Sequence, residues 1–265
     1  EVWQDRSLLV QMARDTGAVL REPEDLPELR RRVREQLAPE YRFLTHMPDI
    51  LETPDYLFVH GGVPSLEGME ELDRWSCMKN DDFLGQGHSF DKWVIVGHWP
   101  VTLYDPAIPS AAPIISRERK IISIDGGCVL KLDGQLNALV IPSEDSEDFS
   151  WTAWDGLPAA RALDGQQASA DPVNVRWGRA ALELLEEGEE LSLCRHLETG
   201  RELYILNEYL RRGESGLWCE DSTDYRLPVS PGELLTVVKK TKRGFLCKKE
   251  GVTGWYYGRL SDIME

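Results

Sequence analysis

The sequence predicts an α/β domain followed by a small all-β domain. Short apolar runs at residues 55–60 and 92–98 follow helical or polar stretches, an order typical of α/β sheets. Further along, short aromatic and β-branched runs between Gly and Pro predict a β tail. Residues 143–172 are rich in Gly, Ala, Asp and Pro, so we expect a linker there. The predicted division is therefore a first domain at residues 1–142, this linker, and a second domain at residues 173–265.

The composition limits the classes of function. At 265 residues the chain has room for one large or two modest domains. Its 30 Lys and Arg against 46 Asp and Glu give a net charge of −16, which argues against nonspecific binding to nucleic acid or anionic membranes. No apolar run approaches the ~20 residues that span a bilayer, and no secretory signal pattern opens the sequence. The five Cys include no CxxC pair, so we expect a cytoplasmic protein with reduced thiols.

The N-terminal region predicts two helices, at residues 6–20 and 25–47. Pro23 and Asp25 mark the start of the second, and apolar residues then keep approximate helical spacing among many Arg and Glu. Those charged residues are expected to form a solvated face. A polar, partly helical stretch is expected at residues 67–83.

Two predicted strands end in the same way. The stretch PDYLFVHGGVPS contains a buried strand at residues 55–60 that ends in His60, and KWVIVGH at residues 92–98 ends in His98. Glycine beside each histidine removes a side chain where the chain turns sharply, and it lets another group approach the backbone. A site is therefore expected along this edge of the sheet.

A third run, residues 120–141, reads KIISIDGGCVLKLDGQLNALVI and predicts further strands joined by glycine turns. Its Asp133-Gly134 pair is a favourable two-residue turn, so we expect a hairpin between Val129–Leu132 and Leu136–Ile141.

The tail predicts one amphipathic helix, at residues 176–187, and then strands. The strands are expected in ELYILNEYL, ELLTVVKK, RGFLCKKE and TGWYYGRL. The segment GVTGWYYGRLS, residues 251–261, resembles part of a small SH3-like barrel. Such a domain would dock a peptide or protein partner, a cell-envelope component or its own catalytic domain.

A basic cluster interrupts the acidic chain in this tail. With the neighbouring aromatic residues it is similar to a nucleic-acid surface. We prefer the alternative that a short hairpin keeps Lys on its exposed faces and so avoids edge aggregation, and nucleic acid is not an expected partner. The cluster consists of Lys239, Lys240, Lys242, Arg243, Lys248 and Lys249.

His60 and His98 are the strongest candidates for chemistry. A neutral imidazole is the commonest transition-metal ligand, and a strand end fixes its direction while leaving the ring open to a cleft. One strand-end histidine alone is more often structural, but two with adjacent glycines are better candidates. Two imidazoles do not complete a hydrolytic metal site, which needs carboxylates and further ligands. His46, His88 and His196 are expected at the surface.

The order of these motifs resembles a known family. FVHGGVPS, then VIVGHWPV with its histidine 38 residues after the first, then IISIDGG, are similar to the C-terminal half of calcineurin-like metallophosphoesterases of the bacterial serine/threonine phosphatase type. The resemblance covers about residues 1–142 and implies a layered sandwich of sheet and helices. It also implies that His60 and His98 each give one imidazole to a centre of two divalent metal ions, drawn from manganese, iron or zinc.

The resemblance implies a phosphate-binding arginine between the two histidines, where ELDRWSCMKNDDF offers Arg74 and Lys79. Arg74 would bind phosphate bidentately, whereas Lys79 would act only as a point charge. An ordinary solvated surface pair is the alternative for both. Asp125 follows a buried strand and would hydrogen-bond a ligating imidazole, although a cap on the turn at Gly126-Gly127 is the account that we slightly prefer.

Three earlier motifs of the family do not occur in this sequence. They are Gly-Asp-x-His-Gly, Gly-Asp-x-x-Asp-Arg-Gly and Gly-Asn-His-Glu, which supply the bridging aspartate, the other metal ligands and a general-acid histidine. The catalytic residues are therefore unknown in this chain. Glu1 would be the last residue of the third motif, so we expect a piece of a longer protein that lacks roughly one hundred residues of the domain. This chain alone is expected to be weakly active or inactive.

The expected reaction is metal-dependent hydrolysis of phosphate monoesters, on a phosphorylated protein or a small phosphoester. A dinucleoside-polyphosphate hydrolase is the nearest alternative, because it would share the metal centre and differ in its substrate pocket. A noncatalytic binding module, in which His60 and His98 only pack, is the alternative from another class.

Overall fold

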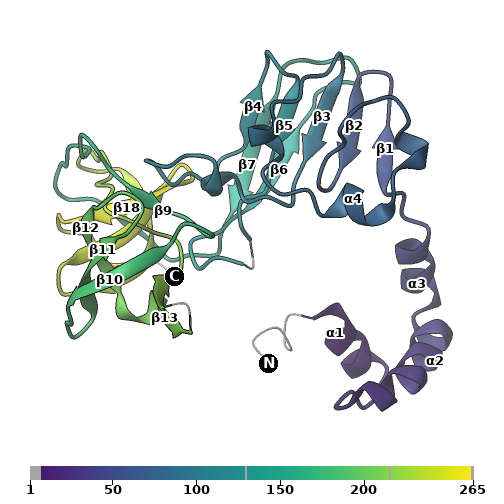
Figure 1. Cartoon of the computed structure of the whole chain (residues 1–265), viewed down its shortest axis with the longest axis horizontal. Helices are drawn as coiled ribbons and strands as arrows, with labels where there is room; N and C mark the ends of the chain where they lie inside the picture. Colours follow the sequence, from purple (N-terminus) through teal and green to yellow (C-terminus); the bar gives the residue numbers. More distant parts are fainter. Residues whose placement is uncertain (1–6, 129, 215, 264–265) are drawn as a thin grey trace. The chain divides into compact units, whose positions relative to one another are not determined.

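The computed structural model describes residues 7–128, 130–214 and 216–263 (Figure 1). Two compact units divide between Asp49 and Ile50, and each is described by itself. The expectations for Glu1 and for residue 129 lie outside the described residues.

The first unit is helical, as predicted, but the second predicted helix is divided. Residues 7–49 form α1 (Leu8–Asp15), the 3-10 turn η2 (Pro23–Asp25), α2 (Leu26–Gln36) and α3 (Ala38–Thr45). The break falls at Leu37, where φ is −117° and ψ is 42°. Pro39 follows, and because it has no amide hydrogen to donate to the preceding turn, one continuous helix is disfavoured.

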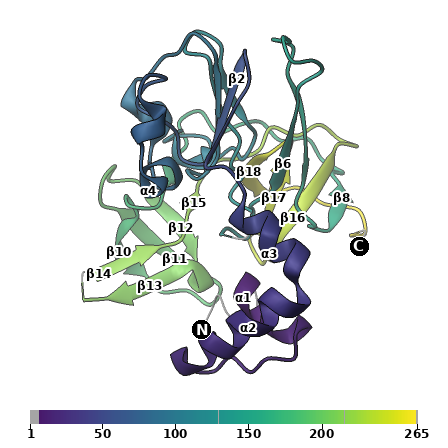
Figure 2. The ribbon, with the colours of Figure 1, turned by 90° about the vertical axis from the view of Figure 1, so that its right-hand side faces the viewer.

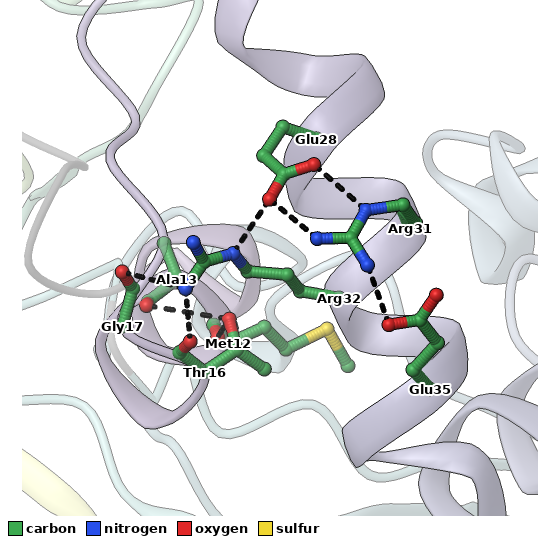
Figure 3. A network of polar contacts seen from close by, with 8 residues as sticks. All are labelled: Met12, Ala13, Thr16, Gly17, Glu28, Arg31, Arg32 and Glu35. Atoms are coloured by element: carbon green, nitrogen blue, oxygen red, sulfur yellow. Dashed lines mark hydrogen bonds and ion pairs between the residues drawn. The ribbon is translucent and has the colours of Figure 1, made fainter.

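Charged side chains join α1 to α2 (Figure 3). The Arg32 guanidinium donates to the carbonyl oxygens of Thr16 at 3.0 Å and Gly17 at 3.1 Å, which lie just beyond the end of α1. Glu28 accepts from Arg32 at 2.8 Å and from Arg31 at 2.7 Å. Below this network the unit has a small apolar core, made of Met12, Ala13, Leu29 and Val33.

The second unit begins with a five-stranded sheet in the order β1-β2-β3-β5-β4 (Figure 1). The two predicted histidine strands are β2 and β3, which pair in parallel, and β3 pairs in parallel with β5. Both edge strands are antiparallel and were not predicted. The bounds are β1 (Ile50–Glu52), β2 (Tyr56–Val59), β3 (Trp93–Val96), β4 (Ile114–Ser116) and β5 (Ile121–Ser123).

Buried apolar side chains cover both faces of this sheet. Leu57, Val94 and Ile121 pack on one face, and Trp93 and Ile122 on the other. This explains why the strands read as continuous apolar runs rather than alternating ones. The connecting segments hold short helical pieces, which are η3 (Met69–Glu71), α4 (Arg74–Met78), η4 (Phe83–Gln86) and η5 (Val101–Leu103).

The hairpin predicted at residues 129–141 is wrong. β6 (Leu136–Val140) pairs instead with β7 (Ser150–Trp154), within the stretch predicted to be a linker. Residues 130–134 form turns, in which the Gly134 amide donates to Lys131 at 3.2 Å. The Asp133 carboxylate accepts from Thr253, so a distant contact fixes this loop rather than a local hairpin.

The rest of the unit, which we call the β-rich half, covers residues 159–263 (Figure 2). Its sheets have the orders β12-β11-β10-β14-β13, β18-β17-β16-β8 and β15-β9. The strands are β8 (Ala159–Arg161), β9 (Asn174–Val175), β10 (Ala181–Glu186), β11 (Leu191–His196), β12 (Glu202–Leu206), β13 (Leu210–Gly213), β14 (Gly216–Cys219), β15 (Ser222–Thr223), β16 (Leu234–Thr241), β17 (Gly244–Lys249) and β18 (Val252–Tyr256), with the 3-10 turn η6 (Asn207–Tyr209).

Two predictions for this region are wrong. The helix expected at residues 176–187 is replaced by β10, which pairs with β11 on one side and β14 on the other. Its Leu and Glu favour a helix by propensity, but pairing on both sides overrides that preference. The expected linker also holds β8, which pairs with β16.

The coarse expectation of a mixed α/β chain with a β-rich tail is confirmed. Among the described residues, the strands of the tail form several sheets and no single closed barrel. Of the helices that the structure describes, none has both the length and the apolar character needed to cross a membrane.

Candidate functional site

The two strand-end histidines lie side by side. Because β2 and β3 are parallel and Phe58 is in register with Ile95, the residues after both strands emerge at the same edge of the sheet. The Gly97 amide donates to the His60 carbonyl oxygen at 2.9 Å. The ring centroids of His60 and His98 are 5.2 Å apart, with an angle of 57° between the ring planes.

The two glycines after His60 are required by close packing. A Cβ atom on Gly61 would lie 3.0 Å from the Asn80 amide nitrogen, and the Gly61 amide itself donates to Cys77 at 2.6 Å. Gly62 has a φ of +121°, and a Cβ atom there would lie 2.4 Å from the Phe83 ring. The end of α4 and the start of η4 therefore pack closely against the turn after β2.

The packing of α4 brings Asp81 to His98. Asp81 Oδ1 lies 2.9 Å from His98 Nε2, with side chains 60% and 12% exposed respectively. His98 has a φ of +61°, in the left-handed region that few non-glycine residues occupy. Sequence reasoning missed Asp81, although the NDDF stretch after Lys79 was a signal that acidic groups lie near the second histidine.

His60 is held in its neutral form. Although the residue is exposed, its ring loses part of its hydration, and this lowers the pKa of His60 from its ordinary value of 6.5. The neighbouring His98 and Lys79 lower the pKa further, while Asp125 acts in the opposite direction. At neutral pH the His60 imidazole is therefore uncharged, which is the form that binds metals.

Asp125 caps a turn. Its Oδ1 accepts the Gly127 amide at 2.8 Å, and its carbonyl oxygen accepts the Val101 amide at 2.8 Å. Of the two roles predicted for Asp125, this is the cap on the turn at Gly126-Gly127. Its effect on the pKa of His60 also places the carboxylate within electrostatic reach of the imidazole, so a hydrogen bond to a ligating ring stays a prediction.

Arg74 and Lys79 lie at opposite ends of α4. Asp73 caps the start of this helix by accepting the Ser76 amide at 3.1 Å, Arg74 is its first residue, and Lys79 follows its last. Both basic residues are exposed. The structure brings Lys79 into electrostatic reach of His60. Phosphate binding by either residue stays a prediction.

Possible metal ligands at this edge are the two imidazoles and the Asp81 carboxylate. Asp81 beside His98 is a carboxylate–imidazole pair of the kind that orients ligating histidines. Within residues 7–128, 130–214 and 216–263, no group of three or more His, Cys, Asp or Glu is arranged to hold a metal ion. The edge thus brings two imidazoles together, their role as metal ligands stays a prediction, and a full metal centre would need further ligands.

The prediction that His196 lies at the surface is wrong. His196 is buried: its Nδ1 lies 2.9 Å from Thr199 Oγ1, and its Nε2 lies 2.6 Å from the Arg179 carbonyl oxygen.

Much of the basic cluster of the tail is paired with acidic groups. The pairs are Lys239–Glu208 at 2.8 Å, Lys248–Asp155 at 3.2 Å, Lys249–Glu233 at 2.7 Å and Lys242–Glu189.

Comparisons of the chain with protein families, with curated proteins and with solved structures found no match.

Proposed function

We propose that residues 50–142 form part of a two-metal phosphoesterase centre that hydrolyses phosphate monoesters in the manner of serine/threonine phosphatases. The observation that carries the proposal is the convergence of two imidazoles at one sheet edge, with ring centroids 5.2 Å apart. Each follows a parallel strand next to glycine, in the order expected from the resemblance to calcineurin-like metallophosphoesterases. A kinship of the β-rich half with SH3-like domains is proposed on the sequence alone.

The side chains at this edge have distinct parts in the proposal. His60 stays neutral and offers a nitrogen lone pair. If His98 donates its Nε2 proton to Asp81, its Nδ1 carries the lone pair and the ring cannot rotate freely. Lys79 and Arg74 would neutralise the oxygens of a phosphate. A pair of divalent ions, when bound, would supply an activated water and hold the phosphate oxygens for in-line attack.

A complete centre requires ligands beyond those described. No residue at this edge is assigned as the bridging carboxylate or the general acid, so we expect weak or absent hydrolysis by this chain alone. Metal binding is the property that the chain itself can show.

The test is a titration of the whole chain with Mn²⁺, followed by calorimetry. The double variant H60Q/H98Q should lose the binding. The control H88Q makes the same exchange at the half-buried His88, whose ring nitrogen lies 3.1 Å from Gln86, and it should keep the binding. Equal Mn²⁺ affinity in all three proteins would contradict the proposal.

Two alternatives predict different outcomes. A dinucleoside-polyphosphate hydrolase would keep the Mn²⁺ binding, and in a protein with the full ligand set it would cleave a dinucleoside tetraphosphate in preference to a phosphopeptide. A noncatalytic module, in which the histidines pack, would bind no Mn²⁺ and show no hydrolysis after manganese is added. This alternative is favoured because, among the described residues, no group of three or more His, Cys, Asp or Glu is arranged to hold a metal ion.

A further inference from the structure

We propose that the β-rich half positions the candidate site, by holding the two chain segments that follow His98 and Asp125. Lys131 and Asp221 are the central positioning residues of this contact. Any effect of this contact on catalysis rests on the proposed function. The contact between the β-rich half and the two segments is observed independently of it.

The first held segment is the loop of which residues 126–128 and 130–135 are described. The Gln135 amide donates to the Gly126 carbonyl oxygen at 3.0 Å, which closes the loop directly after Asp125. Lys131, within the loop, forms an ion pair with Asp221 of the β-rich half, and these side chains are only 14% and 15% exposed. Burial lowers the pKa of Lys131, but Asp133 and Asp221 outweigh this effect and raise it, so the lysine stays charged.

A second anchor lies beside the first. Asp133 Oδ2 accepts the hydroxyl of Thr253 at 2.7 Å, and the Asp133 carbonyl oxygen accepts from Lys248 Nζ at 2.8 Å. The Lys248 side chain is 2% exposed and pairs with Asp155 at 3.2 Å. A lysine this deeply buried is retained only with such partners. The loop is thus fixed at both of its charged residues.

The other held segment, residues 99–111, follows His98. Asn174 of the β-rich half donates from Nδ2 to the carbonyl oxygens of Thr102 and Asp105, both at 2.8 Å. The Trp99 ring meets that of Trp177 edge-on, with centroids 5.7 Å apart.

The two held segments are joined to each other at the site. The Val101 amide donates to the Asp125 carbonyl oxygen at 2.8 Å, so a displacement of one segment is transmitted to the other. His98 needs such support, because a non-glycine residue at a φ of +61° persists only where its surroundings over-determine it. The β-rich half supplies that support from outside the sheet.

Hydrogen exchange of single amides, followed by NMR on the whole chain, tests the inference. In D221N the amides of Gly127 and Gln135 should exchange at least about tenfold faster, equivalent to ~1.4 kcal/mol. The Val94 amide, which bonds to Lys120 at 2.9 Å within the sheet, should be unchanged. The control is E233Q, which removes the Lys249–Glu233 pair of the same half without touching the loop, and it should leave the Gly127 and Gln135 amides unchanged.

Unchanged exchange at Gly127 and Gln135 in folded D221N would overturn the inference, as would equal acceleration in E233Q. If D221N does not fold, T253V decides, because it removes only the hydroxyl that Asp133 accepts. Exchange rates are measured without metal or substrate. A failure of the proposed function therefore shows in the Mn²⁺ titration, and a failure of this inference shows in the exchange rates.

Discussion

Two ion pairs that join the β-rich half to the preceding part of the second unit are far more buried than the Arg31–Glu28 pair of the helical unit. In the helical unit, Arg31 and Glu28 are 54% and 48% exposed although they lie 2.7 Å apart. In the second unit, Lys131 and Asp221 are 14% and 15% exposed, and Lys248 is 2% exposed. The chemistry is the same, a cation beside a carboxylate, but water screens the first pair and is excluded from the others.

This difference separates two roles for charge. Exposed pairs within a helix contribute little to stability, because water already solvates both groups. A buried pair contributes little net energy either, yet removing one partner is costly because the other is left unpaired. Buried pairs therefore hold distant segments in register, whereas exposed pairs mainly keep the surface solvated.

The largest effect is expected from D155N. Lys248 would remain buried and lose its carboxylate, so the free energy of unfolding should fall by about 3 kcal/mol, as for other broken buried pairs. Urea unfolding followed by tryptophan fluorescence measures this loss. In D155L/K248M both charges are removed, and much of the stability should return. A loss in D155N no larger than that of an exposed pair would show that burial is not the deciding difference.

A smaller effect is expected on the pKa of His60, which lies beside the second imidazole, His98. Removing the second imidazole in H98Q should raise the pKa of His60, whereas D125N should lower it, because these neighbours act on it in opposite directions. NMR titration of the His60 ring measures both changes. Since the folded-state pKa lies below 6.5, the stability linked to His60 is present above that pH and is lost as the pH falls. Shifts of the same sign in both variants would contradict the site geometry.

The smallest effect is expected from E28Q in the helical unit. Hydrogen bonds from Arg31 and Arg32 lower the pKa of Glu28 to about 2, so its contribution is present above about pH 4.5 and is lost as the pH falls toward 2. The Glu28 side chain is exposed, and 1 M salt should remove most of the difference because the Debye length is then about 3 Å. Circular dichroism at low and high salt is the measurement. A loss as large as that of D155N would erase the contrast between the two regions.

The site edge could be predicted from the sequence because its signals are local. The apolar runs before His60 and His98 specify buried parallel strands, and glycine after His60 specifies a close approach of the backbone. Asp81 was not predicted, because its contact with His98 depends on how α4 folds back over the sheet edge. The two residues are 17 positions apart in the sequence, and no periodicity links them.

The missed elements depend on distant partners. The hairpin expected at residues 129–141 had a suitable turn sequence, but Asp133 is used by Thr253, 120 residues further along the chain. β10 has helix-forming residues and becomes a strand because β11 and β14 flank it. In both cases the local preference is real and a tertiary contact outweighs it. The break in the helix at Leu37 has a local cause, because Pro39 follows it. The prediction of one long helix at residues 25–47 did not take Pro39 into account.

The backbone at His98 has a consequence for variants of this edge. Glycine or asparagine would adopt a φ of +61° at lower energy, so exchanging His98 for either should make the turn easier to form while removing its imidazole. One substitution at residue 98 would then make the fold more stable and remove a possible metal ligand. Such a trade-off is what a position kept for chemistry rather than for folding would show.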